Sequence, residues 1–249
     1  MRNIKLTIEY DGTNFNGWQI QGHDQRTVQG EIEKVLHRIF KTQTRLIGSG
    51  RTDSGVHAKG QVAHFKADSS LQPIRILKAI NTYLPEDVSV VKVEDVTEDF
   101  HAQYSVKSKI YRYTVLNSDH RLPLSRFVSF VYPYRLNLAV IRQEAKSLIG
   151  KKDFRSFQSF DPALKPKKKN SVRTIKKLTI KKRGDFVYID IEADGFLYKM
   201  VRNIVGTLLE IGSGLKPKGS IKKILRQKDR TQAGQTAAAH GLCLLEVKY

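Results

Sequence analysis

Cysteine is nearly absent from this 249-residue sequence, which contains only Cys243. A single cysteine excludes an internal disulfide and any zinc site built from several cysteines, and its apolar surroundings, GLCLLEV, favour a place in the core. The sequence also lacks an uninterrupted apolar run of about 18 residues and a charged-then-apolar leader, so we expect a soluble, cytoplasmic protein rather than one that spans a membrane.

Acidic residues are scarce, and their distribution is uneven. Asp and Glu number 24 against 44 Lys and Arg, which leaves a formal net charge of +20 at pH 7. No acidic residue occurs between residues 162 and 184, a segment that we call the basic tract and that includes Lys167, Lys168, Lys169 and Arg173. A charge run is often only a solvated face. In a chain this basic, phosphate binding is favoured, with nucleic acid as the first partner and an anionic membrane surface as the second.

The apolar residues make up 40% of the sequence, enough for a folded core, and they recur with the periods of strands and helices. Alternation predicts strands over 4–10, 45–48, 61–67, 88–93, 110–116, 175–180, 186–193 and 242–247. Helical spacing predicts helices that begin at Val28 behind the N-cap Thr27, at Pro73, near Ile141 and at Phe196. This mixture predicts an α+β fold with antiparallel sheets and helices packed on one side, in two domains, 1–104 and 105–249.

A glycine-rich segment between two of these strands, GSGRTDSGVHAKGQVAHF at 48–65, carries the most unusual combination of residues. It matches neither phosphate-loop pattern, because no Lys-Ser or Lys-Thr follows the glycines and the dinucleotide spacing is absent. What remains is a turn that presents Arg51 and Asp53, although an Asx-type turn in which Asp53 bonds its own backbone would also explain it. We interpret His64 as a structural residue of a strand. His57 lies closer to the loop, but no second group is spaced to share a metal with it.

A second unusual feature is an arginine inside a strongly apolar helix, GFLYKMVRNIVGTLLEIG. The helix is apolar nearly all round and is expected to be buried, with Arg202 near its middle. A buried guanidinium needs a carboxylate or phosphate beside it, unless the side chain reaches the surface. If Asp53 is the partner, the pair keeps that carboxylate ionised, and both groups face a cleft between the two halves.

Two tyrosines form a third candidate feature, in the strand SKIYRYTV. Tyr111 and Tyr113 share one face of this strand, and Arg112 lies on the other. Tyrosines in such positions are usually core or rim residues. The functional alternative is a platform on which a nucleobase stacks, as in proteins that read single-stranded RNA.

Taken together, these motifs resemble the bacterial tRNA pseudouridine synthase A family. The resemblance runs along the whole chain, through EYDGTNFNGWQIQ, TVQGEIEKVL, GRTDSGVHAKGQVAHF, FHAQYSVKSKIYRY, GFLYKMVRNIVGTLLEIG and GLCLLEVKY in that order. Two departures are visible: Ser54 stands where alanine is usual, and Tyr198-Lys199 precede Met200 where histidines are common. Neither departure affects the residues that the family needs.

The resemblance implies both a fold and an activity. The fold would be the pseudouridine synthase fold, two α+β domains related to RNA-recognition (RRM, ferredoxin-like) folds, whose antiparallel sheets meet at a central basic cleft. The activity would be the isomerisation of uridine to pseudouridine at positions 38, 39 and 40 of the tRNA anticodon stem-loop. The family works as a homodimer and needs no cofactor and no metal.

The resemblance also implies roles for individual residues. Asp53 matches the catalytic aspartate, Arg51 a residue that helps to extrude the base, Tyr111 the stacking tyrosine, and Arg202 the partner of the aspartate. Tyr111 is also expected to bind substrate, together with Lys167, Lys168, Lys169 and Arg173 of the basic tract. Two rivals stay open: a non-catalytic tRNA-binding or chaperone module on the same fold, and a metal-dependent RNA nuclease. The first would explain the charge and the aromatic residues, but not an acid–base pair divided between a loop and a buried helix.

Overall fold

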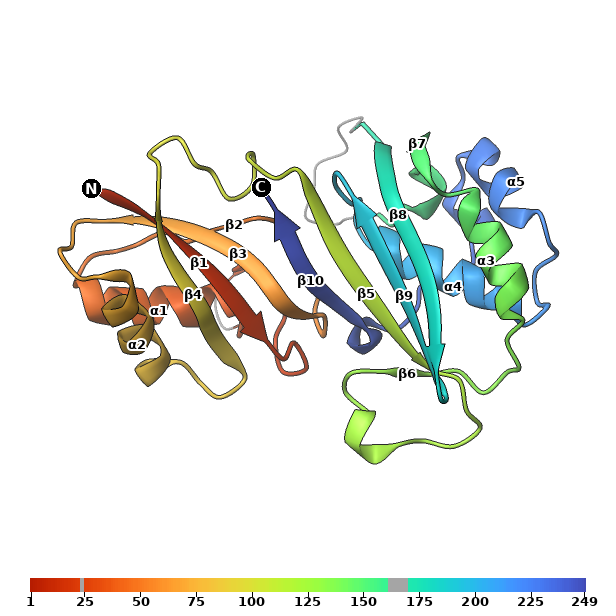
Figure 1. Cartoon of the computed structure of the whole chain (residues 1–249), viewed down its shortest axis with the longest axis horizontal. Helices are drawn as coiled ribbons and strands as arrows, with labels where there is room; N and C mark the ends of the chain where they lie inside the picture. Colours follow the sequence, from red (N-terminus) through yellow and green to blue (C-terminus); the bar gives the residue numbers. More distant parts are fainter. Residues whose placement is uncertain (23–24, 161–169) are drawn as a thin grey trace. The chain divides into compact units, whose positions relative to one another are not determined.

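The computed structural model describes residues 1–22, 25–160 and 170–249. The chain divides into two compact units (Figure 1): the first unit comprises Met1–Lys107 and Cys243–Tyr249, and the second comprises Ser108–Leu242. Both units combine helices with β-strands, which confirms the α+β class. The units differ from the domain ranges 1–104 and 105–249 mainly in the last strand, which belongs to the first unit because it pairs there with β3 (His57–Ala67).

In the first unit the sheet has the strand order β4 (Val88–Val96), β1 (Arg2–Tyr10), β3 and β10 (Leu242–Lys248). β1 lies antiparallel between β4 and β3, with Leu6 opposite both Ala63 and Val93. The two-residue strand β2 (Ile47–Gly48) is also antiparallel to β3, whereas β10 is parallel to it. The parallel pair departs from the antiparallel sheet predicted, because β10 follows a long excursion of the chain through the second unit rather than a hairpin.

Two amphipathic helices complete the first unit, and both were predicted. α1 (Val28–Phe40) packs against α2 (Pro73–Tyr83), and α2 packs against β4. Thr27 caps α1, because its hydroxyl oxygen accepts a hydrogen bond of 3.2 Å from the backbone N–H of Gly30. The buried face of α1 consists of Val28, Ile32, Val35 and Leu36, which are the apolar positions that the helical period selects.

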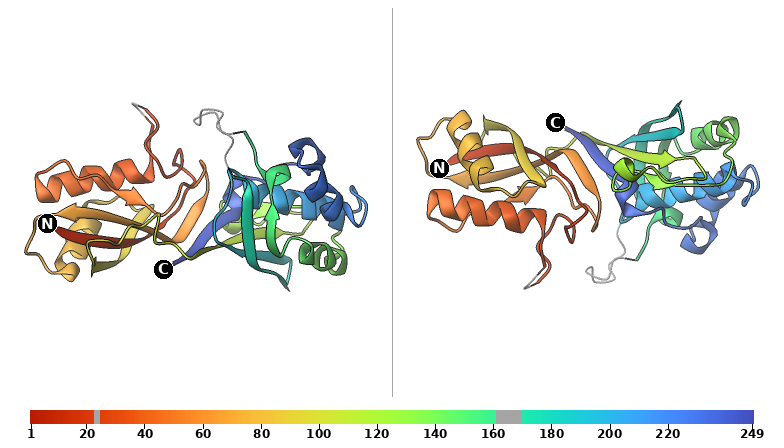
Figure 2. Two further views of the ribbon diagram at one scale, coloured as in Figure 1. Left: turned by 90° about the horizontal axis from the view of Figure 1, so that it is seen from above. Right: turned by 90° about the horizontal axis from the view of Figure 1, so that it is seen from below.

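The second unit is built on the strand order β5 (Ser108–Leu116), β9 (Phe186–Ala193), β8 (Val172–Arg183) and β7 (Gly150–Asp153), with every neighbouring pair antiparallel. The short strand β6 (Phe130–Val131) joins β5 in parallel. α4 (Met200–Gly212) packs against β5 and against α3 (Leu138–Lys146), and α3 also contacts α5 (Ser220–Gln227) (Figure 1, Figure 2). The core between them includes the fully buried side chains of Tyr113, Phe154, Phe157, Ile189 and Ile204.

The elements that differ from prediction have local causes. α4 begins at Met200 instead of Phe196, because Lys199 adopts a left-handed backbone conformation (φ 57°) that a helix cannot include. β3 begins at His57 rather than at Gln61, so the glycine-rich segment enters the strand earlier than alternation indicates. The strands β6 and β7 and the helix α5 were not predicted, because elements of two, four and eight residues carry too few periods to be recognised.

Candidate active site

Asp53 lies in the loop between β2 and β3, which we call the Asp53 loop (residues 49–56). The loop closes with a tight turn in which the backbone N–H of Val56 donates to the carbonyl of Asp53 at 3.1 Å, and Gly55 takes the positive φ of 77° that this turn requires. A backbone hydrogen bond therefore closes the turn. The side chain of Asp53 is half-buried, whereas that of Arg51 is exposed.

A second loop, residues 11–18, holds the Asp53 loop in place. The backbone N–H of Trp18 donates to the carbonyl of Thr52 at 3.2 Å, and the carbonyl of Phe15 accepts from both the N–H of Gly55 (3.3 Å) and the hydroxyl of Ser54 (3.1 Å). The two loops also approach closely at Gly12, where a Cβ atom would lie 2.1 Å from the carbonyl oxygen of Val56. These contacts fix the Asp53 loop. Gly12 permits the close approach of the two backbones because it has no Cβ atom.

Buried polar side chains support the Asp53 loop from beneath. The hydroxyl groups of Tyr10 and Thr52 lie 2.8 Å apart, and burial raises the pKa of Tyr10 well above its usual value. The amide of the fully buried Gln61 accepts from the hydroxyl of Ser49 at 2.7 Å and donates to the carbonyl of Gly50 at 3.0 Å. Both arrangements fix residues 49–52, which lead directly into Asp53.

Both histidines of the segment are buried and hydrogen-bonded. Nδ1 of His64 accepts from the backbone N–H of Ala102 at 3.1 Å, and burial lowers the pKa of this imidazole, which confirms its structural interpretation. Nδ1 of His57 lies 3.0 Å from the backbone nitrogen of Gly12 and 3.1 Å from Oδ1 of Asp11. His57, the first residue of β3, is therefore tied to the loop of residues 11–18. Among residues 1–22, 25–160 and 170–249, no group of three or more His, Cys, Asp or Glu side chains could hold a metal ion.

In the second unit, β5 places Tyr111 and Tyr113 on its buried face and Arg112 on its other face, as alternation predicts. Tyr111 is 8% exposed, and its ring meets that of Phe196 edge to face at a centroid distance of 5.1 Å. Arg112 forms two hydrogen bonds with the carboxylate of Asp190, at 2.8 and 2.9 Å. Burial in the core and the ring contact with Phe196, which precedes α4, therefore set the position of Tyr111.

Arg202 extends from the first turn of α4, between the buried residues Val201 and Asn203. It is half-buried, so α4 is not enclosed on every side. Its Nε donates to the carbonyl of Ala237 at 2.8 Å, and its own carbonyl accepts from the backbone N–H of Ala237 at 3.2 Å. Burial raises the pKa of Tyr113 strongly, and the nearby charge of Arg202 opposes that shift. The backbone at residue 237 therefore orients the guanidinium.

Sequence reasoning missed the segment that carries Ala237, residues 230–238. Arg230 donates to three acceptors, the carbonyl of Gly234 (3.0 Å), Oδ1 of Asn203 (2.9 Å) and the hydroxyl of Thr236 (3.0 Å). The hydroxyl of Thr207 accepts from the N–H of Gly234 at 2.8 Å. The available signal was the pair Asn203 and Thr207, because polar side chains inside an apolar helix require hydrogen-bonding partners.

The predicted site residues are thus divided between the units. Arg51 and Asp53 share one loop of the first unit, and Tyr111 and Arg202 belong to adjoining elements of the second. The pairing of Asp53 with Arg202 joins different units and stays a prediction.

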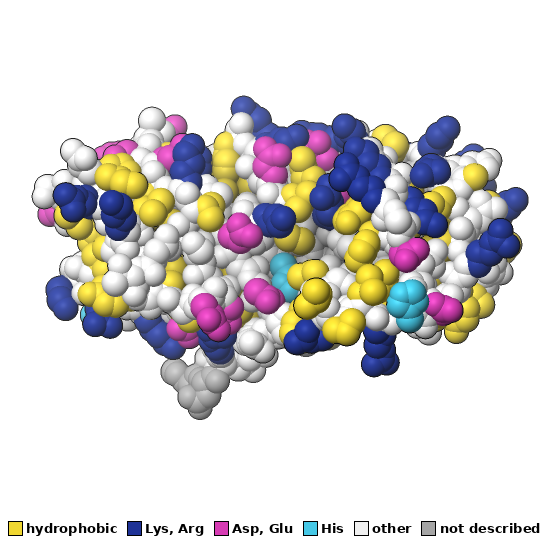
Figure 3. All heavy atoms as spheres, turned by 60° about the horizontal axis from the view of Figure 1, so that its bottom comes forward, with side chains coloured by type: hydrophobic (Ala, Val, Ile, Leu, Met, Phe, Trp, Pro, Cys, Tyr) yellow, Lys and Arg dark blue, Asp and Glu magenta, His cyan; other side chains and the backbone are white. Residues whose placement is uncertain are grey.

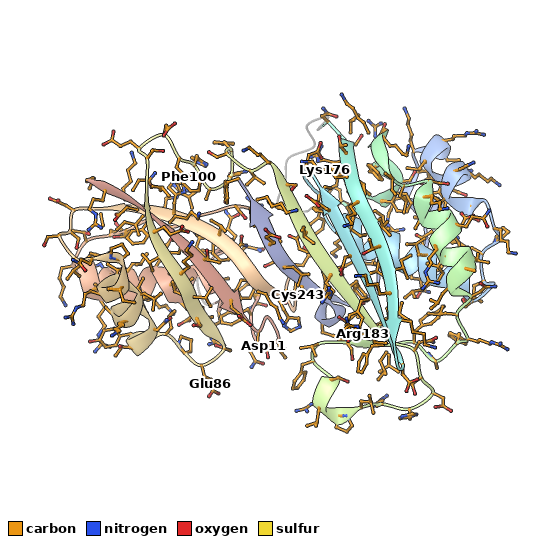
Figure 4. The ribbon with its side chains drawn as sticks, viewed as in Figure 1. Asp11, Glu86, Phe100, Lys176, Arg183 and Cys243 are labelled. Atoms are coloured by element: carbon orange, nitrogen blue, oxygen red, sulfur yellow. The ribbon has the colours of Figure 1, made fainter. Side chains whose placement is uncertain are left out.

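The basic tract is described only in part, since Lys167, Lys168 and Lys169 lie outside the described residues. The guanidinium of Arg173 donates to the carbonyls of Asn170 (2.9 Å) and Val172 (2.7 Å), which folds it against its own backbone. The rest of the tract is β8, where Lys176 and Arg183 lie toward opposite ends (Figure 4) and every Lys and Arg from residue 176 onward is exposed. Lys and Arg side chains also gather on the face shown in Figure 3.

None of the helices in the described part of the chain has the length and apolar character needed to cross a membrane.

Comparison with known proteins gives consistent matches along the chain. A family model described as tRNA pseudouridine synthase matches residues 6–105 and 145–249. The tRNA pseudouridine synthase A of Thermoanaerobacter sp. (strain X514) is 43% identical over 249 residues, which is 100% of both chains. Proteins named tRNA pseudouridine synthase A 2 from Clostridium perfringens (strain 13 / Type A) and Bacillus anthracis are 42% and 41% identical, again over 100% of both chains. A crystal structure of a Cbf5-Nop10-Gar1 complex aligns with 96% of this chain and 57% of that chain, with a TM-score of 0.39 and 11% identity.

Proposed function

The chain belongs to the tRNA pseudouridine synthase family, and we propose that it isomerises uridine to pseudouridine at positions 38, 39 and 40 of the tRNA anticodon stem-loop. The observation that carries this proposal is the Asp53 loop, in which a second loop and buried polar side chains fix the turn that carries the half-buried Asp53. A group that must meet one ribose and one base needs such preorganisation, because misplacement by about 1 Å can cost about a hundredfold in rate.

The reaction rearranges one nucleotide without loss of atoms. The bond between ribose C1′ and uracil N1 breaks, C1′ bonds to C5 of the turned base, C5 loses its proton and N1 gains one. We assign Asp53 as the nucleophile, whose carboxylate attacks the ribose or the ring and is released again when the base reattaches. The isomerisation itself involves neither net oxidation nor hydrolysis.

The other roles follow from the chemistry of each side chain. Arg51 is exposed on the same loop as Asp53, where its guanidinium could occupy the space that a flipped nucleotide leaves or hold its backbone. Tyr111 is held edge to face by Phe196, and we assign it stacking on the extruded uracil and proton transfer at C5. Arg202 is aimed by the Ala237 carbonyl, and we assign it the task of keeping Asp53 ionised.

The proposal extends to the state in which the enzyme works. We propose a cytoplasmic homodimer that binds tRNA through its excess of basic side chains. The net charge of +20 supports the binding of tRNA. Sedimentation analysis with and without tRNA would measure the oligomeric state. A monomer under both conditions would contradict the dimer without affecting the assigned chemistry.

The decisive experiment compares the Asp53→Asn variant with the unchanged protein on a tRNA transcript, with pseudouridine mapped chemically at each nucleotide. We expect Asp53→Asn to form no product while its tRNA affinity stays within a few-fold, because the amide keeps the shape but loses the nucleophilic charge. Asp119→Asn, at a side chain that is 93% exposed, is the matched control and should keep full activity.

Three outcomes would contradict parts of the proposal. Equal turnover by Asp53→Asn would remove Asp53 from the mechanism. Tight binding of tRNA by the unchanged protein, with every nucleoside left unmodified, would favour the non-catalytic RNA-binding alternative. RNA cleavage that stops when chelator is added would favour a metal-dependent nuclease.

A further inference from the structure

A shallow hollow in the second unit lies outside the residues assigned to the reaction. It has a volume of about 440 Å³, within the range of about 300–1,000 Å³ that small-ligand sites occupy. Two segments form its walls, the short 3₁₀ turn Arg155–Phe157 with the residues that follow it, and the link after α5, which leads into a second 3₁₀ turn. These turns pack against each other, so the hollow belongs to one unit. Its lining consists of Arg155, Gln158, Ser159, Phe160, Lys228, Asp229 and Arg230.

Positive charge dominates this lining. Asp229, the one acidic residue among the described lining residues, is turned toward Thr231, whose N–H and hydroxyl donate to its carboxylate at 2.9 and 2.6 Å. Arg155 is exposed, and the side chain of Lys228 is 56% exposed with Asp153 Oδ2 3.4 Å from its Nζ. Asp153 is only 20% exposed, but the Lys228 side chain keeps more than half of its surface in solvent, so both cations can meet an anionic ligand.

Arg230 has a different place in the hollow. Its guanidinium is held by Gly234, Asn203 and Thr236, so it supplies positive potential from a fixed wall. The same Asn203 donates through Nδ2 to the carbonyl of Phe157 (2.8 Å) and the hydroxyl of Ser159 (3.1 Å). The hollow is thereby joined to α4 at the residue next to Arg202.

Two features of the lining are unfavourable for the isolated protein. Phe160 is 80% exposed at the hollow, although a phenyl ring gains free energy when it is buried. Lys228 ends α5 in the left-handed conformation (φ 54°), where glycine is the usual residue because it has no Cβ atom. An aromatic ring beside several cations is the combination with which proteins hold unpaired nucleotides, since the ring stacks on a base and the cations meet the backbone.

We propose that this hollow binds one backbone phosphate of the substrate tRNA through Arg155 and Lys228, with an adjoining unpaired base stacked on Phe160. The nucleotide bound here is not the one that reacts, and the inference rests on the proposed tRNA substrate. Arg230 lends potential, and the amide of Gln158 can meet the edge of the stacked base. The hollow thus fixes where the substrate lies relative to the second unit.

The phosphate contact is tested by the salt dependence of tRNA binding to the full chain. Arg155→Gln/Lys228→Gln should weaken binding about tenfold or more at low salt and make the slope of log affinity against log salt shallower by about one to two. Lys222→Gln/Lys223→Gln, at exposed residues of α5 outside the hollow, removes the same charge and should change the slope less. Equal slopes for the two double variants would overturn the phosphate site.

Lys228→Gly separates binding from folding. Glycine relieves the left-handed backbone, so this variant should be at least as stable as the unchanged protein while it binds tRNA more weakly. Weakened stability together with unchanged affinity would assign Lys228 a structural role and contradict its place in the site.

The stacking contact is tested with Phe160→Leu, which keeps an apolar side chain but removes the aromatic ring. An anticodon stem-loop RNA should bind about tenfold more weakly with an unchanged salt slope, whereas a blunt RNA duplex of equal charge should bind as before. An equal loss for both RNAs, or no loss, would overturn the stacked base.

Product mapping with the unchanged protein keeps this inference separate from the proposed function. An absence of pseudouridine would contradict the proposed function, whereas the salt slopes would still decide whether the hollow binds RNA.

Discussion

At the scale of single residues, Gly12 and His64 each fix a contact between distant segments of the first unit. Gly12 lets the backbone of one loop touch that of another, and the buried His64, in β3, accepts a hydrogen bond from the backbone N–H of Ala102. Neither residue carries charge to the substrate. Both affect catalysis or stability through the position of other groups, so their substitution should separate folding from chemistry.

Gly12→Ala should move the Asp53 loop. Its new Cβ would lie 2.1 Å from the carbonyl oxygen of Val56, far inside van der Waals contact. The backbone N–H of Val56 donates a hydrogen bond to the carbonyl of Asp53, so a shift of Val56 would reach Asp53. We expect turnover to fall about a hundredfold, and the free energy of unfolding to fall by about 1–3 kcal/mol. Single-turnover kinetics on folded protein and urea denaturation would measure the two effects, and near-normal turnover would show that the loop tolerates displacement.

His64 should make stability depend on mild acid. Burial lowers its pKa below the usual 6.5, with the neighbouring charge of His101 acting in the same direction. The unfolded chain therefore binds a proton at a higher pH than the folded chain, so stability rises with pH through this range and is lost as pH falls below about 6.5.

The measurement for His64 is urea denaturation at pH 7.5 and pH 5.5. His64→Asn, whose amide oxygen can still accept from Ala102, should lose part of the difference between the two pH values. His120→Asn, at a ring that is 64% exposed, should keep it. Identical pH dependence in all three proteins would show that His64 does not contribute.

At the scale of secondary-structure elements, the sequence was informative where one element contains its own signal. Thr27 and the apolar face behind it predicted α1, and alternation predicted β5 with Tyr111 and Tyr113 on one face. The partners of an element could not be read in this way. The pairing of β10 with β3 depends on the return of the chain after residues 68–241, and the folded form of residues 230–238 depends on hydrogen bonds to α4.

The candidate site divides in the same manner. The sequence singled out four residues because their surroundings are chemically unusual: Arg51, Asp53, Tyr111 and Arg202. In the structure Arg51 is exposed, Asp53 and Arg202 are half-buried, and Tyr111 is buried. The residues that set those positions, such as Gln61 and Ala237, have ordinary side chains in ordinary patterns. Their contribution is geometric, so no property of the isolated sequence distinguishes them.

The segment 230–238 should prove to be an element on which Arg202 depends. Asn203→Ala removes the acceptor shared by Arg230 and Thr236, and it should lower the free energy of unfolding by about 2–3 kcal/mol because a charged donor loses one of its three acceptors. Turnover should fall further than tRNA affinity, since Ala237 would no longer hold the guanidinium. Thr236→Val breaks fewer bonds and should lower stability by about 1 kcal/mol. Equal turnover in Asn203→Ala and the unchanged protein would separate this segment from Arg202.

At the scale of the whole molecule, the two units divide the tasks of the reaction. In the mechanism that we propose, the first unit supplies the carboxylate and the base-extruding arginine, and the second supplies the stacking tyrosine and the guanidinium. The chain enters the second unit after Lys107 and returns at Cys243, so two covalent connections join them. A substrate as large as tRNA then requires charge spread over much of the surface, which the formal charge of +20 provides.

The basic tract should account for a distinct share of that attraction. Replacing Lys167, Lys168 and Lys169 by glutamine should weaken binding to every tRNA alike, because contacts with phosphates carry no base information. If each lysine meets one phosphate, the slope of log affinity against log salt should become shallower by about two to three. The matched control replaces three exposed lysines of the first unit, Lys41, Lys66 and Lys78. Both triple variants lose the same net charge, so only specific contact makes their slopes differ; equal slopes would make the tract part of a general positive field.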